Sequence, residues 1–113
     1  MHETSIAKNL LKIILNKAEE CNANRITKIT VQLGEFSGIN KDSLIFAFRN
    51  ITQETIANNS AINIHQLPLL GKCRQCKKEF SINKEEFKCP KCGSVKIDII
   101  SGEDIYIDNI EIE

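Results

Sequence analysis

The sequence lacks any long run of apolar residues, and the apolar positions near its start are interrupted by Lys8, Lys12 and Lys17. A signal peptide needs a continuous apolar core and a membrane-spanning helix needs about 20 such residues, so neither is expected. Without a secretion signal, paired cysteines are more typical of metal ligands than of disulfides. These absences predict a cytoplasmic protein with no membrane partner.

Aromatic residues make up only 5% of the chain, and the formal net charge is +0. The charges are nevertheless unevenly distributed. Residues 72–96 are mainly basic, with Lys72, Arg74, Lys77, Lys78, Lys84, Lys88, Lys91 and Lys96 against Glu79, Glu85 and Glu86. Residues 97–113 carry only acids, namely Asp98, Glu103, Asp104, Asp108, Glu111 and Glu113. A metal ion held by four thiolates would reduce the basic excess to roughly +3, too little for a nucleic-acid surface, so no nucleic-acid partner is expected.

Histidine is also scarce, since only His2 and His65 are present. No Cys/His or Ser/His/Asp arrangement suggests a nucleophilic hydrolase, and a zinc ion with four cysteine ligands has no open coordination position. We therefore do not expect an enzyme. His65 falls on a strand face opposite Ile62 and Ile64, which predicts a solvated side chain.

Two cysteine pairs are the strongest motif in the chain: Cys73 with Cys76, and Cys89 with Cys92. Two C-x-x-C turns separated by a dozen residues match the spacing of a tetrahedral site for structural Zn²⁺. Gly93 supplies the permissive backbone that such a turn often needs. The remaining cysteine, Cys21, is expected to be a small buried residue near the end of the first helix.

Apolar periodicity predicts five elements of secondary structure. They are a helix over 4–22, a strand over 25–36, a helix over 41–53 capped by Asn40, a strand over 61–67 and a strand over 97–113. The face of the first helix that points to the core should hold Ile6, Leu10, Ile13, Ile14, Lys17, Ala18 and Cys21. In the last strand the alternation shifts phase near Asp108 and Asn109, which predicts a β-bulge there.

This order predicts an α+β fold in which two helices cover a small mixed β-sheet, with an inserted Cys₄ zinc-ribbon-like module. Residues 1–67 and 99–113 would form one discontinuous domain. Residues 68–98 would form the zinc-binding module between its last two strands.

His2 follows the initiator methionine, and this position suggests a second metal site. Fused chelate rings around one metal ion can be formed by the α-amine of Met1, the backbone amide of His2 and its imidazole Nδ1. Glu3 can supply the fourth ligand of a square-planar site. Square-planar nitrogen coordination favours Ni²⁺ or Cu²⁺ over Zn²⁺ or Mg²⁺. Taken alone, His2 is better explained as a solvated terminal residue.

Several motifs occur together along the whole chain. They are Met1-His2-Glu3, the turn at residues 34–38, Phe46-Ala47-Phe48, Ala61, the two cysteine pairs with Gly93, and Gly102-Glu103-x-Ile105-x-Ile107. With this set the sequence resembles the HypA/HybF family of hydrogenase maturation nickel metallochaperones. The resemblance implies that Met1, His2 and Glu3 bind the Ni²⁺ cargo, and that Cys73, Cys76, Cys89 and Cys92 hold Zn²⁺.

The resemblance also implies two partners, a HypB-type GTPase and the precursor of the [NiFe]-hydrogenase large subunit. Two positions depart from the family pattern. Thr4 stands where relatives usually carry a larger apolar residue, and residues 77–88 contain no histidine, although some relatives have histidines beside their zinc cysteines.

Two other interpretations remain open from the residues alone. One is a zinc-ribbon module that binds nucleic acid or protein, and the other is a rubredoxin-like iron carrier of electrons. A homodimer is also compatible with the sequence.

Overall fold

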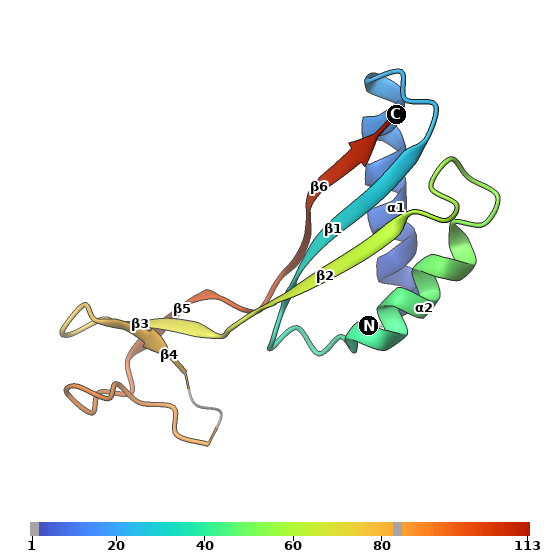
Figure 1. The fold of residues 1–113 in the computed structure, drawn as a ribbon. Helices are drawn as coiled ribbons and strands as arrows, with labels where there is room; N and C mark the ends of the chain where they lie inside the picture. The colour runs from blue at the N-terminus through green and yellow to red at the C-terminus, as the bar shows by residue number, and fades with distance from the viewer. Residues whose placement is uncertain (1–2, 83–84) are drawn as a thin grey trace.

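The computed structural model describes residues 3–82 and 85–113, which form an elongated body of 54 × 25 × 18 Å. Its elements are α1 (Glu3–Glu20), β1 (Ile26–Gly34), α2 (Lys41–Ile51), β2 (Ala61–Leu67), β3 (Leu70–Cys73), β4 (Glu79–Ser81), β5 (Ile97–Ser101) and β6 (Ile105–Ile112). Figure 1 shows them arranged as two separate sheets, one beside the helices and one at the far end. Neither helix in the described part of the chain has the length and apolar character to cross a membrane.

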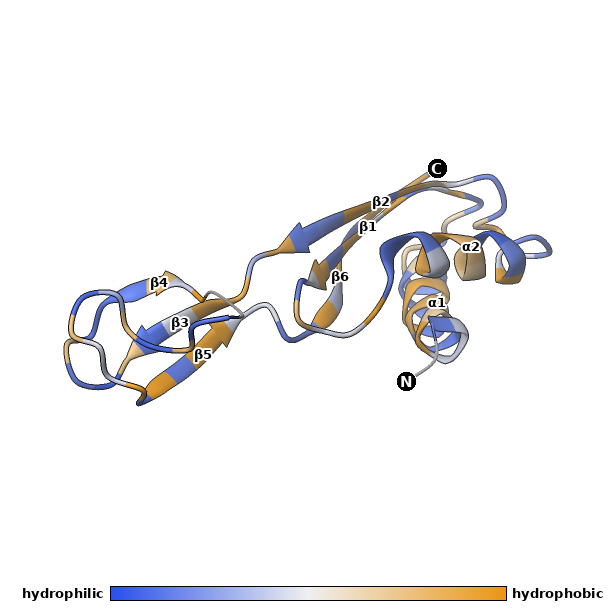
Figure 2. Cartoon of the chain, turned by 90° about the horizontal axis from the view of Figure 1, so that it is seen from below, coloured by the Kyte–Doolittle hydropathy of each residue, from blue (hydrophilic) through white to orange (hydrophobic). Residues whose placement is uncertain are grey.

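The larger sheet has the strand order β2-β1-β6 and is mixed, because β1 pairs in parallel with β2 and antiparallel with β6. Both helices lie on the same side of this sheet (Figure 2). Between these layers, Ile14, Ile29, Leu33, Leu44 and Phe48 are almost completely buried. The expected α+β fold, with two helices on a small mixed sheet, is confirmed.

The buried stripe of α1 differs from the one expected. It consists of Ile6, Ala7, Leu10, Leu11, Ile14 and Ala18, which recur with the helical period. Ile13 is 58% exposed and Cys21 is also exposed, so their predicted burial was wrong. Both residues lie on a neighbouring stripe of the helix, which faces the border of the sheet at β6 instead of its centre.

Two local predictions are confirmed. The side chain of Asn40 accepts a hydrogen bond of 2.9 Å from the backbone N–H of Ser43, which caps α2 at its first turn. Opposite β1, Thr30 pairs with Asn109 whereas Val31 pairs with Ile107, so Asp108 is the extra residue of a bulge. The bulge keeps Ile107 and Ile110 on the side of the sheet that packs on the core.

The single strand expected over residues 97–113 is instead two strands in different sheets. Gly102 adopts φ = 101° and interrupts the strand, so that β5 pairs with β3 and β6 pairs with β1. The isoleucines before and after the break, Ile97 and Ile99 and then Ile105 and Ile107, keep the same phase, and for this reason the sequence pattern did not reveal it. The division into domains stays a prediction, but strand pairing places residues 99–101 with the smaller sheet, β4-β3-β5.

The two sheets are joined at a crossing of three backbone segments, which we call the junction: residues 34–36, 67–69 and 102–104. Gly34 N–H donates to Asp104 C=O at 2.8 Å, Glu35 N–H to Leu67 C=O at 2.8 Å, and Phe36 N–H to Gly102 C=O at 2.7 Å. Glycine permits this close approach, since a Cβ on Gly34 would collide with the carbonyl of Gly102.

Replacing Gly102 with alanine is expected to destabilise the fold strongly. The new Cβ would meet Leu69 Cα at 2.6 Å and Pro68 O at 2.7 Å, both of them backbone atoms, at a positive φ. We expect a loss of about 2–4 kcal/mol in the free energy of unfolding, measured by urea titration of the zinc-loaded protein. Gly38→Ala is the matched control, because Gly38 has φ = 80° with no neighbour within 4 Å, and it should lose only about 1 kcal/mol. Equal losses in the two variants would contradict this role for the junction.

Candidate metal centre

The four paired cysteines lie on two turns with the same backbone design. In the first turn, Lys77 N–H donates to Cys73 C=O at 3.0 Å, and Lys77 has φ = 65°. In the second, Gly93 N–H donates to Cys89 C=O at 2.8 Å, and Gly93 has φ = 75°. Each turn therefore closes on the residue four positions after its first cysteine, and there the backbone takes the left-handed conformation.

Hydrogen bonds also fix the entry to each turn. Cys73 N–H donates to Lys78 C=O, and Cys89 N–H donates to Ser94 C=O, both at 2.9 Å. The two turns thus repeat one arrangement at equivalent positions. As a result, two sulfur atoms of each turn can point toward the other turn.

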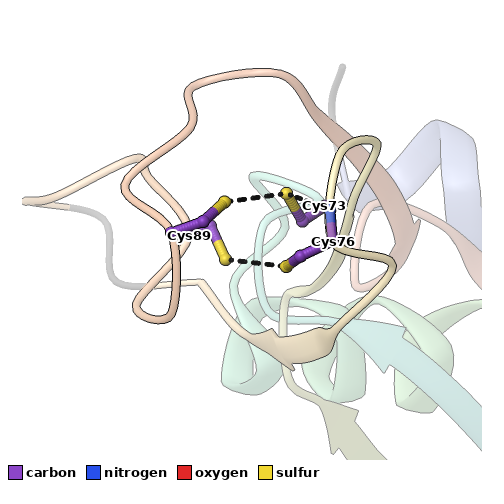
Figure 3. A group of neighbouring side chains, drawn as sticks. Cys73, Cys76 and Cys89 are labelled. Carbon is purple, nitrogen blue, oxygen red and sulfur yellow. Dashed lines mark hydrogen bonds between the residues drawn. The ribbon is translucent and has the colours of Figure 1, made fainter.

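The cysteine sulfurs converge on a common point (Figure 3). The Sγ atoms of Cys73 and Cys92 are 3.5 Å apart, as are those of Cys76 and Cys89, and all four lie within 4.8 Å of one another. In a tetrahedral zinc site with Zn–S bonds of about 2.3 Å, sulfurs are separated by about 3.8 Å. A disulfide would need a separation of about 2 Å, and all four cysteines are free. The cluster therefore suits a structural Zn²⁺ ion.

The surroundings of the sulfurs already favour negative charge on part of the cluster. The backbone N–H of Cys76 points at the sulfur of Cys73 and lowers the pKa of that thiol from 9.0 to about 6. Burial opposes ionisation of Cys89, but the N–H groups of Cys92 and Lys91 outweigh it, so its pKa is also lowered.

Cys92 shows the opposite shift. The N–H of Ser94 favours its thiolate, but the neighbouring sulfur of Cys73, burial and the sulfurs of Cys89 and Cys76 together raise its pKa to about 11. Four sulfurs this close cannot all ionise without a cation between them. A divalent metal ion removes this conflict, because it stabilises every thiolate at once.

The second predicted metal site, at the start of the chain, is only partly within the described residues. Met1 and His2 lie outside them, whereas Glu3 is the first residue of α1 and is partly exposed. Glu3 and Thr4 line a cavity of about 470 Å³ together with Asp42 and Phe46 at the start of α2. Phe46 is 69% exposed there, although it is a large aromatic residue.

Sequence reasoning missed this association of Asp42 and Phe46 with Glu3. Periodicity placed both residues on α2 but carried no information about which end of α1 they would meet. Thr4 is exposed, so its difference from the family pattern leaves the buried core unchanged. His65 is exposed on β2, as predicted.

Fold and site together define a class: a small α+β metal protein with a cysteine-cluster module beyond its main sheet. Comparison with known proteins narrows this class. A family model described as hydrogenase/urease nickel incorporation metallochaperone, HypA, matches residues 1–112. The chain therefore belongs to the HypA family.

The sequences of known HypA proteins align with this chain over its full length. The hydrogenase maturation factor HypA of Dehalococcoides mccartyi strain CBDB1 is 34% identical over 100% of this chain and 95% of its own. That of Aquifex aeolicus strain VF5 is 36% identical over 100% of this chain and 98% of its own. The solution structure of the nickel metallochaperone HypA from Helicobacter pylori has the same fold, with a TM-score of 0.74 at 24% identity over 99% and 97% of the two chains.

Exchanging residue types between the two turns should change zinc affinity in opposite directions. Lys77 adopts a left-handed conformation that favours glycine, so Lys77→Gly removes strain of about 1 kcal/mol and should tighten zinc binding about fivefold. Gly93→Ala adds similar strain without a clash, because no atom lies within 4 Å of its Cβ position, and should weaken binding about fivefold. Competition with a chromophoric zinc chelator measures both changes. Shifts in the same direction would contradict the proposed equivalence of the two turns.

Proposed function

We propose that this chain binds Ni²⁺ through the amine of Met1, His2 and Glu3, and delivers it to the precursor of a [NiFe]-hydrogenase large subunit. Cys73, Cys76, Cys89 and Cys92 hold the structural zinc ion. A HypB-type GTPase is the proposed partner in delivery, and the cytoplasm is the proposed location, where five free cysteines stay reduced. The role is that of a carrier, without catalysis.

The observation that carries the proposal is the family match, which extends from residue 1 through both metal motifs. The chemistry of the N-terminal residues is consistent with it. Square-planar Ni²⁺ rewards deprotonation of a backbone amide, and the first amides of a helix have no acceptor within that helix. Glu3 is the first described residue of α1, so its own amide is at such a helix start.

The two metal sites suit different roles. A cluster of four thiolates has no open coordination position and holds its ion permanently. Ligands at the end of a chain can leave a metal one at a time, because fraying of a terminus costs little free energy. A carrier needs the second kind of site for its cargo.

A nickel titration of the tag-free protein tests the cargo site. His2→Ala, and separately a blocked N-terminal amine, should each abolish the diamagnetic square-planar Ni²⁺ spectrum while the zinc content stays unchanged. His65→Ala is the matched control, because this exposed histidine lies on β2 and should leave nickel binding intact. Undiminished nickel binding in His2→Ala, or its loss in His65→Ala, would refute the proposed ligands.

Loss of one sulfur tests the structural role of the zinc cluster. Cys73→Ala should weaken zinc binding by more than about 100-fold and unfold the β4-β3-β5 sheet, because metal binding and folding are coupled. Helix α1 should remain folded, since its buried stripe packs on the other sheet. Zinc content and NMR spectra of the two regions measure these effects. Cys21→Ala, which removes an exposed cysteine outside the cluster, should change neither.

A further inference from the structure

Strand β6 forms one edge of the larger sheet, because β1 pairs with it on one side only in the order β2-β1-β6. The direction of its backbone groups follows from the pairing at its end. Glu113 N–H donates to Arg25 C=O at 2.9 Å, and Arg25 N–H donates to Glu113 C=O at 3.4 Å. Backbone groups alternate in direction along a strand, so the amide and carbonyl of Ile112 point away from β1 toward the open edge.

An apolar groove of about 440 Å³ accompanies this edge. Helix α1 contributes Ile13, Ile14 and Lys17, the turn after it contributes Cys21, and β6 contributes residues 107–110 and Ile112. Ile13 and Ile112 are 58% and 37% exposed. Ile13 and Cys21, the two residues whose exposure the helical pattern did not predict, both line this groove. The groove is thus open to solvent beside unpaired backbone groups.

Acidic residues follow this edge of the sheet. Asp108 lines the groove, Glu111 also lies on β6, and Asp104 and Glu113 flank the two ends of the strand; we call these four acids the acidic rim of the edge. Residues 97–113 contain no lysine or arginine. Within the described residues no ion pair is formed by these four acids. Three cations lie near these acids: Lys17 lines the groove and pairs with Glu20 at 3.6 Å, Lys28 stands opposite Glu111 in the sheet, and the backbone of Arg25 pairs with that of Glu113.

We propose that the β6 edge and its groove, which we call the β6 edge site, bind an extended segment of a partner protein that alternates apolar and basic residues. The segment would add to the sheet as a fourth strand. Its backbone would pair with the free groups of β6, alternate apolar side chains would enter the groove beside Ile13, and basic side chains would meet the acidic rim.

The charges also argue against a second copy of this chain as the occupant. Pairing β6 with β6 would place acids on facing strands with no base to offset them, and facing like charges are destabilising. A basic strand reverses the sign of this effect, so the same acids select a different partner.

Binding of a designed peptide tests this site on the full-length zinc protein. The probe is a capped synthetic peptide of about ten residues that alternates valine with lysine, and the control peptide alternates valine with glutamate. We expect the lysine peptide to bind at least about tenfold tighter by calorimetry, with an affinity that falls as salt rises. NMR shifts should concentrate on β6 and on the stripe of α1 that carries Ile13 and Lys17.

A pair of variants separates backbone pairing from side-chain contact. Ile112→Pro removes the amide that points to the open edge, and proline is tolerated at such positions of edge strands. Ile112→Ala removes the same side chain but keeps the amide. We expect the proline variant to lose at least about tenfold more affinity than the alanine variant, with both remaining folded by circular dichroism.

Equal binding of the two peptides, equal effects of the two variants, or shifts confined to the zinc module would overturn the proposal. Self-association of the protein that Ile112→Pro abolishes would also overturn it, by showing a second copy as the occupant. The probe carries no metal, so these outcomes are independent of the nickel and zinc assignments.

Discussion

The fold depends on the metal site of the four cysteines, because this site cross-links the segment of residues 69–101, whose apolar packing is insufficient. Between residues 69 and 101, the buried apolar side chains are Leu69, Cys73, Ile82 and Cys89 among the residues described. A sheet of three short strands cannot be stable on so few contacts, because the entropy of ordering each residue costs about 1–2 kcal/mol. Two of those four side chains are cysteines of the cluster, so the centre of this small core is also its metal site. A zinc ion bound by the cluster therefore supplies the folding free energy that this segment does not obtain from a hydrophobic core.

The larger sheet has no such need, since its buried core draws on both helices and all three strands. What it requires is a fixed connection to the smaller sheet. The junction provides one through backbone hydrogen bonds among three segments, two of which are the only covalent links between the sheets. Gly34 and Gly102 make the crossing close enough for these bonds. Side chains there would hold the segments apart.

Sequence patterns predicted the elements of the larger sheet well because their signals are local. Asn40 precedes α2 and carries the side-chain oxygen that caps the first turn of a helix. The phase shift at Asp108 also marks a bulge within a few residues. The cysteine spacing likewise predicted a cluster that the structure forms.

Features that depend on long-range contacts could not be predicted in this way. The exposure of Ile13 depends on how far α1 lies from the border of the sheet, and no periodicity encodes that position. The break at Gly102 leaves the phase of the isoleucines on its two sides unchanged, although it places β5 in another sheet. The cavity beside Glu3 arises where two helices distant in sequence meet.

The arrangement would also keep the proposed nickel site apart from the cysteine cluster. Thiolates hold nickel as readily as zinc, and soft ligands do not by themselves exclude the cargo ion. Here the sulfurs are committed to a closed cluster on the smaller sheet, beyond the junction, while Glu3 lies at the start of α1 beside α2. This separation would keep the proposed nickel ligands away from the sulfurs. Selectivity would then rest on geometry, because four converging sulfurs favour a tetrahedral ion, whereas the proposed terminal amine with adjacent amides favours a planar one.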